Sequence, residues 1–344
     1  MNPAKTKVLI VKIGAIGDAV MALSMITEID KKYPDAEITW LCGDIISPLI
    51  KSISRINEVI TLNENKLLVG SKIEQFSVIL KIWTKLIFRK FDLAVNAHRD
   101  KRYDLLLLTA IKKECKSFSG KDRKNQLVQG RYHAAEYARL IHKTDDWKIS
   151  EPVFPKIQIS KAPEIEKLIG ESKGWRIILT PGGARNLING GAQRKWAIEN
   201  YVLLAEILIE KYSNATIILA GSELDKDEAT CFNKLHVVNL IGKTTLTDVI
   251  SLYNSCKLLI THDTGLLHLA KLSNIYSIAL FGPVNPVERI GKNEKIDAIW
   301  LGNELPCSPC YNGKSFAACE NNVCMKNITV DMVLKRAEKF LESN

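Results

Sequence analysis

Three short segments of the sequence carry residue types that could bind and transfer a phosphorylated substrate. The first reads THDTGLLH from Thr261 to His268 and lies where an apolar run passes into a helical pattern. Asp263 or Thr264 can cap that helix, and the N–H groups of Thr264 and Gly265 can then receive phosphate oxygens. His268 follows Thr264 by four residues and therefore lies on the same helix face. An ordinary capped helix with a half-buried histidine is the alternative interpretation.

The second segment is Pro181-Gly182-Gly183, which follows another apolar run and precedes Arg194-Lys195-Trp196 after a loop. Glycines let a ligand approach the backbone, and two cations before a helix suit a diphosphate. Taken alone, the pattern is also that of a surface loop with incidental basic residues. Its pairing with the first segment in one domain favours a diphosphate site.

The third segment, Gly14-Ala15-Ile16-Gly17-Asp18, joins the apolar run VLIVKI to a helical pattern. Its glycines are spaced G-x-x-G, which differs from the dinucleotide fingerprint G-x-G-x-x-G. Asp18 at a helix start is a routine N-cap, and the helix dipole would keep its carboxylate ionised. An ionised carboxylate that faces a cleft can also serve as a general base.

Strands alternating with helices position all three segments. Apolar β-forming runs precede each segment, and helical periodicity follows. Such alternation predicts parallel sheets covered by helices on both faces. The expected strands are 7–13, 37–41, 58–62, 91–97, 175–180, 216–220, 236–240, 258–261 and 276–281, and the expected helices include 71–90, 101–111, 132–142, 198–211, 225–233 and 246–254.

The alternation breaks over 144–163, where three prolines predict a linker. We therefore expect two Rossmann-like, doubly wound parallel-sheet domains, residues 1–160 and 161–344, facing a cleft. Ligands of such sheets bind at the carboxyl ends of the strands, where the three segments lie.

Composition limits where the protein works. A chain that is 46% hydrophobic and 25% charged is globular rather than disordered. Its first apolar stretch is broken by Lys12, Gly14 and Asp18, so we expect no signal peptide, no membrane span and a cytoplasmic protein.

From Lys66 to Lys143 there are 18 Lys and Arg against 7 Asp and Glu, so the net charge of +10 comes from this region. This region is expected to meet a polyanion or an acidic surface, or else to be a solvated basic face.

The three segments together resemble glycosyltransferase family 9, which includes the lipopolysaccharide heptosyltransferases. The resemblance rests on GAIGD after the first strand, PGG with the later R-K-W, and HDTGLLHLA followed by ALFGPVNP. These motifs occur in order from Val8 to about Val330, and D-T-G-x-x-H is the most specific. The resemblance implies a GT-B fold, with an acceptor-binding N-terminal domain and a C-terminal domain that binds a nucleotide-sugar.

The resemblance also implies roles for individual residues. Asp18 corresponds to the proposed base, beside Gly17, and Arg194 to the cation that binds phosphate. The remaining donor-binding positions are Gly183, Lys195, Asp263, Thr264, Gly265 and His268, with the nucleobase near Thr244 and the ribose on Asp225, Asp227 or Glu228, of which we select Glu228. Many relatives have Lys before Arg where this chain has Arg194 before Lys195, and the loop 186–193 is unusually rich in Gly and polar residues.

The expected reaction is a single inverting displacement that needs no metal. Asp18 takes the proton of an acceptor hydroxyl, while the cations stabilise the leaving nucleotide. We favour ADP-heptose as donor and a lipopolysaccharide core or related glycan as acceptor. The alternatives are another nucleotide-sugar, or a non-catalytic protein that binds nucleotide-sugars or polyanions.

Acceptor binding is assigned to cations of the basic region. Arg99, Arg102 and Arg123 are the selected residues, and His98, Lys101, Lys121, Lys124 and Arg131 are further candidates. Gly17 of the first segment is also assigned to acceptor binding. Within 71–91, apolar residues are interleaved with lysines. The favoured interpretation is a core helix with snorkelling lysines. The alternative is an interfacial helix near a lipid-linked acceptor at the inner membrane surface. The partners expected are thus the donor and this acceptor, with no nucleic acid and a monomeric protein.

The spacing of four cysteines near the C-terminus is compatible with a metal site. Cys307, Cys310, Cys319 and Cys324 could bind a structural zinc. Their intervals are short and differ from a standard finger, so reduced thiols are favoured and no cofactor is expected.

Overall fold

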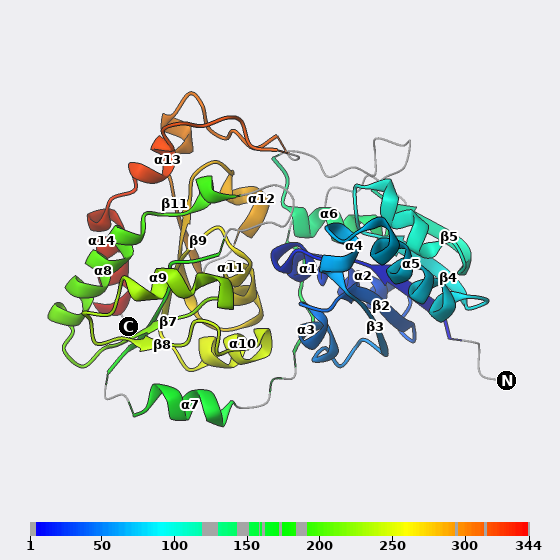
Figure 1. Ribbon diagram of the computed structural model, residues 1–344, viewed down its shortest axis with the longest axis horizontal. Helices are drawn as coiled ribbons and strands as arrows, with labels where there is room; N and C mark the ends of the chain where they lie inside the picture. The colour runs from blue at the N-terminus through cyan, green and yellow to red at the C-terminus, as the bar shows by residue number, and fades with distance from the viewer. Residues whose placement is uncertain are drawn as a thin grey trace. The chain divides into compact units, whose positions relative to one another are not determined.

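The computed structural model divides the chain into two compact units, Met1–Gln158 and Ile159–Asn344. Each unit holds one parallel sheet with helices on both of its faces (Figure 1). The structure describes residues 5–118, 130–142, 151–157, 159, 162–171, 174–183, 191–292, 295–312 and 315–342.

The first unit is built on a five-stranded sheet of order β3-β2-β1-β4-β5. Its strands are β1 (Lys7–Val11), β2 (Glu37–Gly43), β3 (Glu58–Leu62), β4 (Lys90–Asn96) and β5 (Ile111–Ser117). Its helices are α1 (Ile16–Ala22), α2 (Ser24–Lys32), α3 (Ser47–Lys51), α4 (Glu64–Leu68), α5 (Lys72–Leu86), the 3₁₀ helix η1 (Lys101–Leu107) and α6 (His133–Leu140). The central strands β1 and β2 are buried almost throughout, as expected for a sheet covered on both faces.

The second unit is built on a six-stranded sheet of order β11-β10-β9-β6-β7-β8. Its strands are β6 (Arg176–Thr180), β7 (Thr216–Leu219), β8 (Val238–Asn239), β9 (Leu258–His262), β10 (Tyr276–Phe281) and β11 (Ile296–Trp300). Its helices are α7 (Pro163–Ile169), α8 (Ile198–Lys211), α9 (Lys226–Thr230), α10 (Leu246–Asn254), α11 (Gly265–Leu269), α12 (Pro286–Ile290), α13 (Val323–Lys326) and α14 (Val330–Glu342), with 3₁₀ turns η3 (Ala192–Arg194), η4 (Glu223–Asp225), η5 (Ala270–Leu272) and η6 (Gly302–Glu304).

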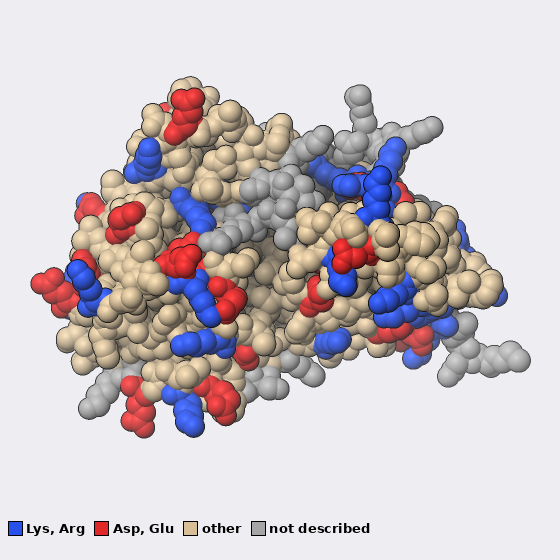
Figure 2. Space-filling view, in the orientation of Figure 1, with Lys and Arg blue, Asp and Glu red and all other residues tan. Residues whose placement is uncertain are grey.

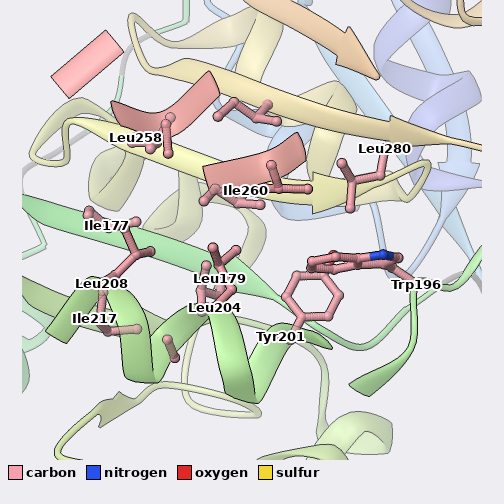
Figure 3. Close-up of a cluster of buried hydrophobic side chains, with 14 of the residues drawn as sticks. Ile177, Leu179, Trp196, Tyr201, Leu204, Leu208, Ile217, Leu258, Ile260 and Leu280 are labelled. Carbon is pink, nitrogen blue, oxygen red and sulfur yellow. The ribbon is translucent and has the colours of Figure 1, made fainter. Parts of the chain in front are cut away.

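The core of the second unit shows why its helices take their places. Helices α8 and α14 cover one face of the sheet, while α10, α11 and α12 lie on the other (Figure 1). On the α8 face, Leu204 and Leu208 pack against Ile177 and Leu179 of β6 (Figure 3). The four-residue spacing of the two leucines directs both to the sheet.

The strand prediction identified the edge strands β3 and β8 but missed β5 and β11, the strands at the other edge of each described sheet. In β5, four of the seven residues are charged, and the uncharged ones are Ile111, Cys115 and Ser117. Within the described residues this strand pairs only with β4 and exposes much of its surface, so its sequence tolerates charges that a central strand would exclude. The predicted helix over 71–90 ends instead at Leu86, because β4 begins at Lys90.

Candidate functional site

Both units present their sequence motifs at the point where the strand order reverses. In the first sheet β1 and β4 are neighbours although β2 and β3 lie between them in sequence, and in the second sheet β6 and β9 are neighbours in the same way. The loop after β1 is the GAIGD segment, whereas β6 and β9 lead into the PGG and DTG segments. Open α/β sheets bind ligands at such switch points.

The PGG loop is held in place by Asp225. The Gly183 N–H donates to Oδ1 of Asp225 at 2.8 Å, and Oδ2 accepts from the Ser222 N–H at 2.8 Å and hydroxyl at 2.7 Å. A Cβ on Gly182 would lie 2.3 Å from Cγ of Asp225, so only glycine fits there. Asp225 is buried and its carboxylate is engaged by this loop, whereas Glu228 is paired with Lys195.

Gly183 and Thr264 bring the two motifs of the second unit into contact. Gly183 has φ of +84°, a conformation that favours glycine, and a Cβ there would lie 3.2 Å from Cγ2 of Thr264. The hydroxyl of Thr264 is buried and has no hydrogen-bond partner within the described residues. The same holds for the hydroxyl of Thr244 and for Nε of Arg194. Buried polar atoms are normally paired, so these three groups suit a polar ligand.

Asp263 is a buried carboxylate surrounded by cations. Arg194 Nη1 donates to its backbone oxygen at 3.1 Å and lies 3.4 Å from Oδ2, while His268 Nε2 lies 3.9 Å from Oδ1. Burial would raise the pKa of Asp263, but Arg194, Arg289 and His268 together lower it below its ordinary value. A carboxylate repels a diphosphate, so this geometry suits Asp263 to orienting Arg194 and His268 rather than to touching phosphate.

Lys195 and Glu228 form the other charged pair of this region. Lys195 Nζ donates to Oε1 of Glu228 at 2.7 Å, and both side chains are largely buried. Trp196, the next residue, is buried and donates from Nε1 to the Ile328 oxygen at 2.7 Å. Its ring packs edge-on against Tyr201 at 4.9 Å (Figure 3). This anchored indole fixes the backbone directly after the two cations.

Two further basic residues near Asp263 were missed by the sequence analysis, and burial holds the pKa of one of them, Lys271, well below its ordinary value. Arg289 of α12 acts on its carboxylate, and Lys271 donates from Nζ to the Arg289 oxygen at 2.6 Å. Lys271 follows His268 by three residues on one helical stretch, which was the available signal. Helix α11 has only five residues, so its dipole would contribute less to binding an anion than the side-chain cations would.

In the first unit, Asp18 lies in the first turn of α1 beside a buried lysine. Lys12 Nζ is 3.5 Å from Oδ2 of Asp18, and the two side chains are 4% and 38% exposed. Burial alone would lower the pKa of Lys12, but Tyr137 and Asp18 raise it above its ordinary value. Lys12 is therefore the counter-charge of Asp18. The sequence analysis missed it, although a lysine that ends a buried strand was a signal. Gly17 is buried within the same turn.

His98 does not supply a positive charge to an acceptor, contrary to the sequence-based suggestion. Its Nε2 accepts the Ile13 N–H at 2.9 Å, and its ring stacks on Tyr103 at 3.8 Å. Burial, together with the charge of Lys12, places the pKa of His98 well below its ordinary value. The neutral ring supports the loop after β1.

Glu64 is a residue of this region that the sequence analysis did not identify. It is buried, and a Cβ on Gly14 or Gly43 would lie 2.1 Å from Oε1 or 2.7 Å from Oε2 of its carboxyl group. Burial and the nearby Asp44 raise the pKa of Glu64, while Lys12 acts in the opposite direction. Within the described residues, its carboxyl group has no hydrogen-bond or ion-pair partner. A second carboxyl group thus lies beside the GAIGD loop.

The remaining predicted residues are at the surface or outside the described ranges. Arg102 is exposed and paired with Asp100, to which its Nε donates at 2.7 Å. Arg99 is exposed, while Arg123 lies outside the described residues, as do Lys121 and Lys124. The described residues include no group of three or more His, Cys, Asp or Glu side chains that could hold a metal ion. Burial raises the pKa of the Cys324 thiol to about 11, and the other three cysteines of the quartet add to this effect.

Comparisons with known proteins identify the family. Residues 79–319 match the family model described as glycosyltransferase family 9 (heptosyltransferase). Lipooligosaccharide heptosyltransferase 2 of Haemophilus ducreyi is 26% identical over 309 residues, covering 81% of this chain and 84% of the relative. Lipopolysaccharide heptosyltransferase 2 of Escherichia coli is 24% identical over 305 residues, with the same coverage.

Solved structures of such enzymes share the fold. The structure of E. coli ADP-heptose LPS heptosyltransferase II aligns with a TM-score of 0.75 at 21% identity, over 98% of this chain and 99% of that one. E. coli heptosyltransferase WaaC with ADP aligns with a TM-score of 0.69 at 15% identity, over 97% and 99%. Both motif-bearing switch points belong to sheets of this GT-B architecture. The chain therefore belongs to glycosyltransferase family 9, and it is a glycosyltransferase.

Proposed function

We propose that this glycosyltransferase moves a heptose from ADP-heptose to a lipopolysaccharide core or a related glycan. The relatives named above are lipopolysaccharide and lipooligosaccharide heptosyltransferases, and one solved structure of the same fold holds ADP. The observation that carries the proposal lies where β6 and β9 end. There the partly buried cations Arg194 and Lys195 accompany the hydroxyl of Thr264, which has no hydrogen-bond partner among the described residues. That chemistry fits the diphosphate of a nucleotide-sugar.

In the proposed donor site, Arg194 and Lys195 bind the diphosphate. Asp263 holds Arg194 from one side, and the Thr264 hydroxyl is free to donate to a phosphate oxygen. Glu228 accepts from Lys195 with Oε1 and is the best placed acid for the ribose, since Asp225 is occupied. Thr244, another residue whose hydroxyl is buried and has no partner in the described part of the chain, is assigned to the nucleobase.

The proposed chemical step is an inverting displacement with Asp18 as the base. The acceptor oxygen attacks the anomeric carbon, the bond from that carbon to the diphosphate breaks, and the hydroxyl proton passes to Asp18. An aspartate near its reference pKa of about 3.9 is a weak base, so proton transfer comes late, when the attacking hydroxyl has become acidic. Arg194 and Lys195 neutralise the leaving ADP, so the reaction needs no metal.

We further infer that the acceptor is lipid-linked and that the enzyme works as a monomer at the inner face of the cytoplasmic membrane. None of the helices in the described ranges combines the length and hydropathy that crossing a membrane requires. Arg99 and Arg102, both exposed, and Arg123 are assigned to acidic groups of the acceptor.

Calorimetric titration with ADP, UDP and GDP, in EDTA and again in Mg²⁺, tests the donor site. We expect ADP to bind without metal, and Arg194→Ala to weaken it by about 10- to 100-fold because a charge-assisted hydrogen bond contributes about 1.5–3 kcal/mol. Arg89→Ala removes an arginine that is paired with Glu58 in the other unit and serves as the control. Preference for UDP or GDP would keep the reaction class and reject ADP-heptose. Absence of nucleotide binding would reject the donor site.

A further inference from the structure

Helix α5 carries two apolar faces, and only one of them belongs to the core. Val78, Ile82 and Leu86 are buried against the sheet. On the opposite side, Ile73, Phe76 and Leu80 are 82%, 56% and 46% exposed. Their spacing of three and four residues places them in one stripe along the helix. The interpretation of this segment as a core helix with snorkelling lysines accounts for the first face and leaves the second unexplained.

The exposed stripe continues beyond α5. Trp83 donates from Nε1 to the Leu105 oxygen at 2.8 Å, which ties α5 to η1, where Leu108 is 63% exposed. Phe88, just past the helix, is 78% exposed although its backbone has φ of +59°, a conformation that is costly for a bulky residue. Among the described residues, Phe88 is not part of the hydrophobic core of this unit or of the side chains packed against it. We call the surface formed by Ile73, Phe76, Leu80, Leu108, Phe88 and the half-exposed Ile111 the α5 face.

Lysines flank the α5 face. Lys72, Lys81, Lys85 and Lys90 are exposed and form no ion pair with any described residue. The acidic groups nearby are engaged, since Glu58 binds Arg89 and Glu74 caps α5 at Ser71. A groove lined by Lys66, Lys81 and Lys85 runs between α4 and α5. Figure 2 shows the surface over α5 as mostly uncharged, with both blue and red groups beside it.

We propose that the α5 face docks onto an anionic lipid bilayer. Apolar side chains flanked by lysines along a helix are suited to the boundary between headgroups and acyl chains. The lysines complement anionic headgroups, whereas a second copy of this chain would oppose them with charges of the same sign. The choice of a bilayer rests on the proposed function, in which the acceptor is lipid-linked.

Cosedimentation with vesicles tests the proposal. The full-length protein is mixed with vesicles of phosphatidylethanolamine and phosphatidylglycerol, or of phosphatidylcholine alone. The test variant is Ile73→Gln/Phe76→Gln/Leu80→Gln. The matched control, Leu168→Gln/Leu203→Gln/Leu224→Gln, removes three exposed leucines of the second unit. Glutamine is a good helix former, and thermal unfolding verifies that each variant is folded.

We expect the protein to bind the anionic vesicles, and more weakly in high salt. The α5-face variant loses at least about tenfold in partitioning, because buried apolar side chains dominate interfacial binding. Lys81→Gln/Lys85→Gln reduces binding to anionic vesicles only, and the leucine control binds like the wild type. ADP binding and transfer to an acceptor freed of its lipid remain unchanged in all of these variants.

Two results would overturn the proposal. One is vesicle binding by the α5-face variant that equals that of the wild type. The other is a wild-type dimer in sedimentation that this variant dissociates, which would assign the face to self-association. These results can be distinguished from a failure of the proposed function. If the proposed function is wrong, the protein binds no ADP but still binds anionic vesicles.

Discussion

At the residue scale, the first unit places two carboxyl groups of different character near one buried ammonium. Asp18 is partly exposed and lies 3.5 Å from Lys12, while Glu64 is buried against Gly14 and Gly43. Asp18 is thus the more accessible of the two carboxyl groups, and Lys12 is its counter-charge. Burial of the Glu64 carboxyl group has a desolvation cost, and no hydrogen bond from a described residue to this group offsets it.

Asp18→Asn separates catalysis from binding. We expect the transfer rate to fall by about 10²–10⁴, since a positioned general base contributes that much. The Kd for ADP stays unchanged, because the donor site lies in the other unit. The measurement is kcat for transfer together with calorimetry of ADP. The double variant Lys12→Met/Asp18→Asn removes the buried cation as well, and its thermal unfolding shows whether the loss of the pair affects folding. Transfer within tenfold of wild type in Asp18→Asn would remove Asp18 as the base.

Glu64→Gln is expected to stabilise the protein and impair the reaction. Because the folded-state pKa of Glu64 is raised, its ionised form costs stability at pH 7, and that cost disappears as the pH falls below its ordinary value of about 4.3. The variant therefore gains about 1 kcal/mol at pH 7 and no advantage below pH 4. Transfer falls about tenfold if the carboxyl group binds the acceptor.

Urea unfolding at pH 7 and pH 4, with steady-state kinetics, measures both effects. Asp92→Asn, which removes a surface carboxylate paired with Lys113, is the control. A gain in stability without loss of transfer would make Glu64 irrelevant to function.

At the element scale, the donor site depends on loops that follow different strands. Asp225, after β7, holds Gly183, after β6, and Thr264, after β9, contacts the same glycine. Trp196 then anchors the segment that carries Arg194 and Lys195. The cations are therefore positioned before any ligand arrives, which lowers the ordering cost of binding.

Gly182→Ala is expected to displace the PGG loop. The new Cβ would meet Asp225 at 2.3 Å, so either the loop or the aspartate must move. Overpacking of this kind costs about 1–3 kcal/mol, and ADP affinity should fall by at least tenfold. The measurements are thermal unfolding and calorimetry of ADP for Gly182→Ala, Asp225→Ala and the double variant. If the clash is the cause, the two changes are less than additive; strict additivity would contradict it.

At the scale of the whole molecule, each unit contains its own sheet, core and buried neutral histidine. His98 supports the loop after β1, and His262 ends β9 with its Nδ1 3.0 Å from the Tyr201 hydroxyl. Burial, with Arg194, lowers the pKa of His262 to about 3, and the pKa of His98 is also far below its ordinary value.

This pair makes the protein sensitive to acid. A depressed pKa contributes stability that is present above the unfolded-state pKa of about 6.5 and is lost as the pH falls toward the folded-state value. From pH 7 to pH 5, His262 alone should cost the second unit about 2 kcal/mol. Hydrogen exchange of the β9 amides at the two pH values, in wild type and His262→Asn, measures this loss. An equal pH dependence in the two proteins would contradict the assignment.

The sequence by itself determined the family, the tandem α/β organisation and the segments at the strand ends. Central strands such as β9 and β10 can be recognised in the sequence as apolar runs. Glycine, aspartate and threonine residues directly after such runs lie at the carboxyl edge of a parallel sheet. These signals are local in the chain. Two of the four described edge strands, β5 and β11, were not predicted. In β5, charged residues occupy most positions, which a strand that pairs on one side tolerates.

Only the tertiary structure decided which groups meet. The contact between Asp225 and Gly183 spans 42 residues and that between Arg194 and Asp263 spans 69, distances over which periodicity carries no information. The same is true of Glu64 against Gly14. The sequence also did not determine which apolar residues of α5 are buried, because the residue type is the same whether the side chain faces the core or solvent. The packing of Val78, Ile82 and Leu86 settled which face is the core, and so left the other one exposed.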